Sequence, residues 1–250
     1  MAALLQSATP GDTLRFKFAL LHWCGWQANP ATSDDCWPEG GLLTGEHPDL
    51  EFLPIMQRRR LSPLARAACA SAWRCRQACG DMPSIFFSRH GESRYYFEML
   101  TDLARGEALS PSRFSLSVHN AIGGLYGLQC ASRQPYLALA GGGDDVFAGL
   151  VEAAGLLLEV PRVLLVAYDQ ALPEVYLTHI HGPEQTWALA MVLANPGASG
   201  SALELCRTPD RSRPPSPDAG YALLQAACSG QLNGSVATRR ALWQWRLTLG

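Results

Sequence analysis

The sequence is almost without lysine and carries little charge. Of its 20 basic residues only Lys17 is a lysine, and charged residues make up 17% of the 250-residue chain. We read the scarcity of lysine as a coding bias without functional meaning. The formal net charge of −2 argues against general binding of nucleic acid or another polyanion. Hydrophobic residues make up 48%, so the sequence predicts a well-packed globular protein.

The sequence also lacks two kinds of feature that would indicate another class of protein. No apolar run is long enough to cross a membrane, and residues 1–6 lack the basic start of a secretory signal, so neither a membrane span nor a signal is expected. The eight cysteines lack paired CxxC spacing, so buried thiols are favoured over a zinc site or redox use. A reducing cytoplasm fits this cysteine usage best. No metal or cofactor is predicted.

Apolar runs alternate with helical patterns along most of the chain. Buried strands are predicted at 16–23, 84–88, 136–140, 162–168 and 187–194, and helices at 62–79, 92–105, 120–130 and 146–158. The tail, residues 241–249, alternates apolar and polar side chains as a half-buried strand does. Continuous apolar strands between helices imply a sheet that is covered on both faces, and therefore an α/β fold.

The stretch from Pro111 to Leu158 resembles a known family. It is similar to the segment of β-ketoacyl-acyl-carrier-protein synthases that leads into their nucleophile, through Asn120, Gly124, Arg133, the strand at 136–140 and the helix after the next turn. Residues 58–80 resemble the family's first long helix, and residues 187–194 the strand that closes its first half. The resemblance covers about 14–206 and implies a thiolase-like fold with a mixed sheet covered by helices.

One domain is expected over residues 1–250. Its core would span about 14–206, followed by a proline-rich loop at 207–219 and a C-terminal cap at 220–250. A lone half of the duplicated thiolase arrangement would expose an apolar face. That face requires either an obligate partner or the C-terminal cap.

The resemblance fails at the catalytic residue. Ketosynthases carry a cysteine at the turn after this strand, where the start of the next helix lowers the thiol pKa. Here the turn reads Gly141-Gly142-Gly143, and Gly143 takes the place of the nucleophile. Glycine cannot form a thioester. The family's catalytic histidines and lysine come from a second half that this sequence does not include, so no catalytic residue is expected.

The resemblance therefore implies a subunit without catalytic activity. The pattern is most similar to the short chain-length-factor type of β-ketoacyl synthase-like protein of aryl polyene biosynthesis. Such proteins pair with a complete ketosynthase that receives chains from acyl carrier protein. This subunit would shape the far end of the acyl tunnel. The expected interface or tunnel residues are Phe114, Leu116, Val118, Asn120, Gly123, Gly124, Tyr126, Tyr136, Leu137, Ala138, Leu139 and Ala140. Gly123 and Gly124 would permit close helix packing between subunits.

A second motif points to another class of protein. The string RHGE at 89–92, after an apolar strand, resembles the signature of histidine phosphatases, in which the histidine accepts a phosphoryl group. That family also needs a second histidine and a second arginine, and neither His119 nor His181 has the expected surroundings. A loop is favoured, with Arg89 and Glu92 paired at the entry of the next helix. A phosphomonoesterase using His90 and a stand-alone acyl-carrier-binding protein remain the alternatives.

Two smaller clusters have two interpretations each. Arg58-Arg59-Arg60 either contacts an acidic carrier protein or forms a solvated helix entry, paired with Asp49 or Glu51. His179 and His181 alternate as on one face of a strand, a spacing that can bind metal. No third ligand is evident, and polar loop residues are favoured there.

Overall fold

The computed structural model describes residues 5–6, 13–28, 36–210 and 212–250. Its strands are β1 (Leu5–Gln6), β2 (Leu14–Gln27), β3 (Gly40–Leu42), β4 (Ser84–Ser88), β5 (Tyr136–Ala140), β6 (Arg162–Asp169), β7 (Trp187–Ala194), β8 (Ser201–Thr208), β9 (Asn233–Ala237) and β10 (Leu242–Thr248). Its helices are α1 (Ile55–Arg58), α2 (Pro63–Cys79), α3 (Ser93–Ala104), α4 (Pro111–Ser117), α5 (Ala121–Gln129), α6 (Val146–Leu156), α7 (Glu174–Leu177) and α8 (Ala219–Cys228).

The strands of the described residues form one mixed sheet. Its order is β5-β4-β6-β7-β2-β8-β10-β9, with β1 and β3 also paired to β2. β5, β4 and β6 run parallel, and the remaining pairs along this order are antiparallel. The chain therefore has the mixed α/β architecture that the sequence predicts.

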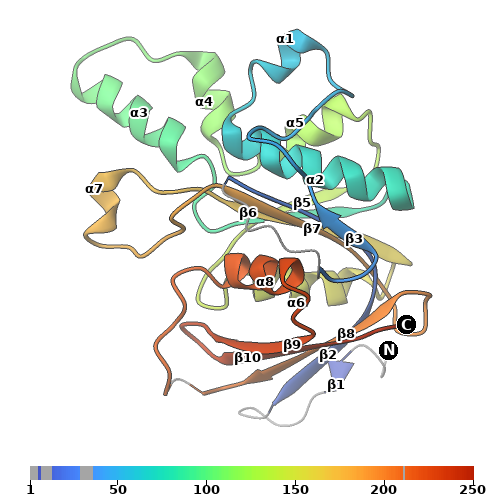
Figure 1. Ribbon diagram of the computed structural model, residues 1–250. Helices are drawn as coiled ribbons and strands as arrows, with labels where there is room; N and C mark the ends of the chain where they lie inside the picture. The colour runs from blue at the N-terminus through green and yellow to red at the C-terminus, as the bar shows by residue number, and fades with distance from the viewer. Residues whose placement is uncertain (1–4, 7–12, 29–35, 211) are drawn as a thin grey trace.

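The long strand β2 divides the sheet into two arms. Residues 19–27 pair with β7, residues 14–20 pair with β8, and the register shifts between Leu20 and His22. Such an irregularity increases the bend and twist of a strand. The sheet curls, and α6 and α8 lie between its first arm (β5-β4-β6-β7) and its second arm (β8-β10-β9), as Figure 1 shows. Helices α2 and α5 cover the other face of the first arm.

Two hydrophobic clusters fill these layers. One lies between the arms and includes Phe147 of α6, Leu223 of α8 and Trp243 of β10. The other lies between the first arm, α2 and α5 and includes Leu64 and Tyr126. Every residue of β7 is buried, because successive side chains enter opposite clusters. The prediction of a sheet covered on both faces is confirmed for its central strands.

The predicted strand at 136–140 is an edge strand, not a buried one. β5 pairs with β4 alone within the described part of the chain, and Tyr136 and Leu137 are 37% and 36% exposed. An apolar run of five residues is typical of both a central strand and an edge strand that packs against something else. The other predicted strands and helices are confirmed, with ends that differ by a few residues.

The C-terminal segment packs into the cluster between the arms. Trp243 is fully buried, and its ring stacks on Phe147 with 4.6 Å between centroids and 6° between planes. Trp245 and Leu247 of the same strand are buried, while Gln244 and Arg246 are exposed. The predicted alternation of this strand is confirmed. The hairpin of β9 and β10 thus covers the inner helices from the side opposite the first arm.

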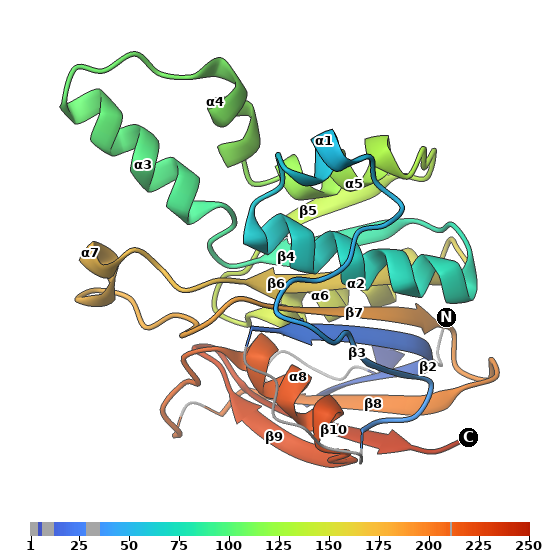
Figure 2. The ribbon, with the colours of Figure 1, turned by 45° about the horizontal axis from the view of Figure 1, so that its top comes forward.

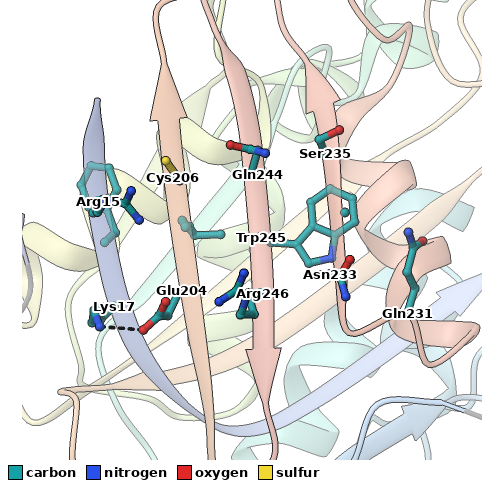
Figure 3. Close-up of a pocket in the computed structure, with 13 residues that line it drawn as sticks. Arg15, Lys17, Glu204, Cys206, Gln231, Asn233, Ser235, Gln244, Trp245 and Arg246 are labelled. Carbon is teal, nitrogen blue, oxygen red and sulfur yellow. Dashed lines mark ion pairs between the residues drawn. The ribbon is translucent and has the colours of Figure 1, made fainter. Parts of the chain in front are cut away.

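The outer face of the second arm is polar. Figure 3 shows Arg15, Lys17, Glu204 and Arg246 on this face, around a hollow of about 880 Å³. Lys17 and Glu204 form an ion pair of 2.6 Å between neighbouring strands. A sheet face of this kind is stable in contact with water, so the second arm leaves no apolar outer face.

The cysteines are free thiols. Cys24, Cys69, Cys75 and Cys228 are buried, and burial raises the pKa of the Cys24 thiol to about 12 and that of Cys75 well above its ordinary value. Such thiols are unreactive at neutral pH, which agrees with the structural role expected for them. None of the described helices combines the length and apolar character of a membrane span.

Candidate functional site

The turn Gly141–Gly143 joins β5 to α6. The Asp145 carboxylate caps this helix, accepting the Val146 N–H at 2.7 Å. Arg240, from the loop between β9 and β10, lies directly against Gly143: a Cβ at this position would stand 2.5 Å from Arg240 Cγ and 2.8 Å from its Cδ. A side chain at position 143 therefore requires Arg240 to move.

The neighbouring Asp144 holds the β9–β10 loop on the glycine turn. Its Oδ1 accepts the Thr238 hydroxyl at 3.0 Å and the Trp243 indole N–H at 3.2 Å. Its Oδ2 lies 3.4 Å from Arg207 Nη2. Because these donors come from β8, β10 and the loop, the carboxylate ties the C-terminal hairpin to the turn. The place that the family resemblance gives to the nucleophile is thus covered by the chain's own C-terminal segment.

The loop after β4 carries the RHGE string and is fixed by Asp169. The carboxylate accepts the Ser88 hydroxyl at 2.9 Å, the Arg89 N–H at 3.1 Å and the His90 N–H at 3.3 Å. Ser88 Oγ in turn accepts the Gly91 N–H at 2.7 Å. The string therefore forms a tight turn around one buried carboxylate.

Arg89 does not pair with Glu92, so the expected helix-entry pair is wrong. Its guanidinium lies 3.4 Å from Asp145 Oδ2 and donates to the carbonyls of His181, at 3.1 Å, and Pro217. These partners were beyond prediction because they come from loops 56 to 128 residues away. Since its donors are engaged with protein oxygens, Arg89 is poorly placed to hold a phosphoryl group. This arrangement does not favour the phosphatase alternative.

Glu92 joins two helix starts. Ser62 caps α2 by accepting the Ala65 N–H, and its hydroxyl donates to Glu92 Oε1 at 2.5 Å. Glu92 is 5% exposed, and burial raises the pKa of its carboxyl from 4.5 to about 7. Burial also raises the pKa of Asp169 to about 7 and that of Asp218 to about 6. The region around the RHGE loop is therefore rich in carboxyl groups that stay protonated to a higher pH than usual.

The raised pKa of Glu92 predicts a pH-dependent gain in stability for Glu92→Gln. As the pH rises, the unfolded chain loses this proton near pH 4.5 and the folded chain only near pH 7. Stability therefore falls across this window, and the loss is complete above it. Glutamine keeps an acceptor for Ser62 and cannot ionise. We expect the variant to gain about 1–3 kcal/mol of unfolding free energy at pH 8 and little at pH 4.5, measured by urea unfolding.

Glu107→Gln is the control for this prediction. Glu107 lies on the exposed turn after α3, and its variant should change stability by less than about 0.5 kcal/mol at either pH. A gain by Glu92→Gln that is equal at both pH values would contradict a buried, proton-holding carboxyl.

Two cavities lie beside the RHGE loop. One, of about 390 Å³, is lined by Gly141, Gly142 and Gly143 together with Arg89, His90, Asp145, His179 and Arg239, among others. The second, of about 330 Å³, is lined mainly by Tyr96, Ser117, His119, Leu172 and Tyr176. His90 and Ile180 line both, so the two cavities are neighbours. Burial and the nearby Arg89 lower the pKa of His90 to about 4, so its ring is neutral.

The residues expected at an interface fall into two groups, one at the surface and one that faces inward. Phe114 and Val118 of the α4 segment are 59% and 39% exposed, and Asn120 is exposed before α5. Leu116 lines a groove with Leu125 and Leu128. The strand Tyr136, Leu137, Ala138, Leu139 and Ala140 forms the open edge of the sheet.

Three of the expected residues face inward instead. Tyr126 is 4% exposed and its ring lies 5.5 Å from that of Phe86. A Cβ on Gly123 would stand 2.9 Å from the Tyr136 ring, and one on Gly124 3.1 Å from the Tyr136 hydroxyl. The glycines therefore let α5 approach β5 of the same chain. Their expected role in packing between subunits stays a prediction.

Helices α3 and α4 project from the body of the protein, as Figure 2 shows. Arg113 Nη1 lies 3.0 Å from Asp102 Oδ2 and ties the two helices together. Only Met99 of α3 is buried, whereas Tyr96, Leu100 and Leu103 are 40–59% exposed. This pair of helices presents apolar side chains that the rest of the described chain does not cover.

The arginines at 58–60 and the histidines at 179 and 181 form no metal site within the described residues. His179 and His181 follow the short helix α7 in a loop, as the favoured interpretation expects, and do not lie on a strand. The described residues contain no group of three His, Cys, Asp or Glu side chains that would hold a metal ion. Arg58 lies 4.0 Å from Asp49, as in the solvated interpretation, while Arg59 and Arg60 are exposed.

Comparison with solved structures shows the same fold. A chain of the complex between the ketosynthase ApeO and its chain length factor ApeC from Xenorhabdus doucetiae matches with a TM-score of 0.75 and 24% identity, over 92% of this chain and 99% of that chain. A β-ketoacyl synthase from Burkholderia phymatum matches with a TM-score of 0.50 and 10% identity, over 60% and 46%. The oxazolomycin ketosynthase domain OzmH from Streptomyces albus gives 0.50 and 11%, over 73% and 43%. The chain thus spans less than half of these two ketosynthases.

Comparison of the sequence agrees with the fold. No match to a curated protein was found. The family described as β-ketoacyl synthase, N-terminal domain, matches residues 23–246, a range that includes the RHGE loop, the glycine turn and most of the C-terminal hairpin. The chain therefore belongs to the β-ketoacyl synthase N-terminal domain family and has its thiolase-like fold.

Proposed function

We propose that this chain is a catalytically silent subunit that pairs with a β-ketoacyl synthase and sets the length of its product. The observation that carries the proposal is the turn before α6. Gly143 stands where the family resemblance places the nucleophile, and the side chain of Arg240 lies against it. Without a thiol at this helix start no acyl-enzyme can form here. The chemistry is then left to a partner subunit.

The match to a ketosynthase–chain length factor complex supports this assignment. The matched chain is nearly the same length as this one, since the match covers 92% and 99% of the two chains. The matches to the two ketosynthases cover less than half of their chains.

The exposed apolar surface supports a partner. β5 offers an unpaired edge with Tyr136 and Leu137 more than a third exposed, and the projecting helices α3 and α4 expose further apolar side chains. Edge strands and apolar patches of this kind are normally covered by another chain. In the proposed complex the partner ketosynthase pairs with β5 and packs against α3 and α4. Arg59 and Arg60 form a contact for an acidic acyl carrier protein.

The cavity between α3, α4 and α7 is the proposed end of the acyl tunnel. Its wall includes Tyr96, Leu172, Tyr176 and Ile180, side chains that suit a hydrocarbon or polyene chain. Ser117 is a small side chain in the same wall. The space it leaves would admit the last carbons of the growing chain. Ser117 follows Leu116 and Phe114, the residues predicted from the sequence, and was missed because a serine gives no apolar signal.

The length of the product tests this role. In the co-purified complex with the ketosynthase encoded nearest to this chain, Ser117→Trp should fill much of the cavity of about 330 Å³. We expect the products to be shorter by at least one two-carbon unit, as measured by mass spectrometry of the carrier-bound chains. The rate of the first condensation should be unchanged, because the partner's catalytic residues are not touched.

Ser115→Trp is the matched control on the same helix. Ser115 is exposed and lines the separate groove with Leu116 and Leu128, so its variant should leave product length unchanged. Equal product lengths in the wild type and in Ser117→Trp would rule out the cavity as the tunnel end. A soluble monomer that binds acyl carrier protein without any ketosynthase would favour the stand-alone carrier-binding alternative.

A further inference from the structure

The cavity beside the glycine turn gathers basic side chains from three loops. Arg239 comes from the β9–β10 loop, His90 from the loop after β4 and His179 from the loop after α7. Arg240 lies at its rim, where its Nη2 is 3.9 Å from the place of a Cβ on Gly142. The cavity of about 390 Å³ is thus approached by two guanidinium groups and two imidazoles in addition to Arg89.

The free charge in this cavity is positive. Arg89 and Asp145 also line the wall, but they neutralise one another at 3.4 Å. Arg239 and Arg240 are exposed and form no ion pair with any described residue. Asp144, the next acid along the chain, is engaged by Arg207, Thr238 and Trp243. Two guanidinium groups without a protein counter-ion therefore meet at one opening.

The cavity wall also holds a hydrogen-bonding group that no atom of the described residues satisfies. His90 Nε2 is buried and has no hydrogen-bond partner in the described structure. A buried ring nitrogen without a partner is unfavourable by about 1–3 kcal/mol, so a ligand that reaches it gains a contact that the protein alone lacks. The α6 start adds no free donor at Val146, because Asp145 accepts that N–H. Recognition must therefore come from the side chains of the three loops.

We propose that this cavity binds a phosphate-type anion, held by Arg239 and Arg240 with His90 and His179 completing the site. A phosphate offers oxygens in several directions, which suits donors that converge from separate loops, and arginine binds it through two N–H groups at once. The volume leaves room for an organic group attached to the phosphate. The ligand is therefore either free phosphate or a phosphate ester. This site does not depend on the proposed tunnel or on the partner.

Calorimetric titration of the full chain tests the site. The chain is titrated in phosphate-free buffer of low ionic strength, with inorganic phosphate in one experiment and phosphopantetheine in a second. If the chain purifies only with a ketosynthase, the complex is used. We expect saturable one-to-one binding that Arg239→Ala weakens at least 10-fold. Tighter binding of phosphopantetheine than of phosphate identifies an ester ligand, and equal binding identifies the free anion.

Arg246→Ala is the matched control for charge. Arg246 is an exposed arginine on β10, on the outer face of the second arm, and its variant should bind as the wild type does. The NMR signals of the His90 ring should move on titration in the wild type and not in Arg239→Ala. Equal weakening by the two substitutions, or a His90 signal that ignores phosphate, would overturn the proposal.

Discussion

Replacing Leu137 with aspartate is expected to abolish co-purification of this chain with the proposed ketosynthase partner. Leu137 is the second residue of β5, the open edge strand, and is 36% exposed. In the proposed complex the partner covers this strand, and a carboxylate there would be taken out of water without a counter-ion. We expect a loss of affinity of at least about 100-fold, which corresponds to about 2.7 kcal/mol. Size-exclusion chromatography with light scattering measures it.

Leu232→Asp is the control for this variant. Leu232 is 37% exposed and precedes β9, the strand at the opposite edge of the sheet. The substitution is chemically identical and should leave the complex intact. If both variants assemble with the ketosynthase as the wild type does, β5 is not the pairing edge. If Leu137→Asp alone is fully folded by circular dichroism and still assembles, the proposed interface must lie elsewhere.

Replacing Trp243 with alanine is expected to destabilise the fold by about 3–5 kcal/mol. Its ring is fully buried between the arms, stacks on Phe147 at 4.6 Å and lies 6.0 Å from Phe16. Its indole N–H also donates to Asp144. The truncation removes these contacts, leaves a cavity and frees the carboxylate that holds the β9–β10 loop. Urea unfolding followed by circular dichroism measures the loss.

Gln244→Ala tests whether this effect belongs to the buried face. Gln244 is the next residue of β10 and is exposed on the outer face of the second arm (Figure 3). Its variant should change stability by less than about 0.5 kcal/mol. Similar small losses for both variants would mean that the C-terminal hairpin is only loosely attached to the inner helices.

Local signals sufficed for the elements of the first arm. Ser62 followed by Pro63 predicts the start of α2, and Gly80 predicts its end. Both hold in the structure because a hydroxyl cap, a first-turn proline and a closing glycine act within one turn of the helix. The continuous apolar runs of β6 and β7 were equally clear, since both faces of these strands are buried.

The structure of the site depends on contacts between residues that are far apart in the sequence, and a local sequence pattern does not predict them. The RHGE string was ambiguous because its conformation is set by Asp169, about 80 residues further along the chain. The open position of β5 depends on the strand order, which a five-residue apolar run does not specify. The proposed absence of a nucleophile at Gly143 rests on the family resemblance. The arginine that lies over this position could not be predicted, because it comes from a hairpin whose place in the fold depends on the curl of β2.

The open edge of β5 has a consequence for how the cell must make this protein. An apolar strand edge can pair with another copy of the same chain as readily as with the intended partner, and such pairing leads to aggregates. If the proposed partner covers β5, any surplus of this chain over that partner would therefore be lost to aggregation or proteolysis. Balanced synthesis of the two chains, from neighbouring genes and at similar rates, would keep the unpaired form rare.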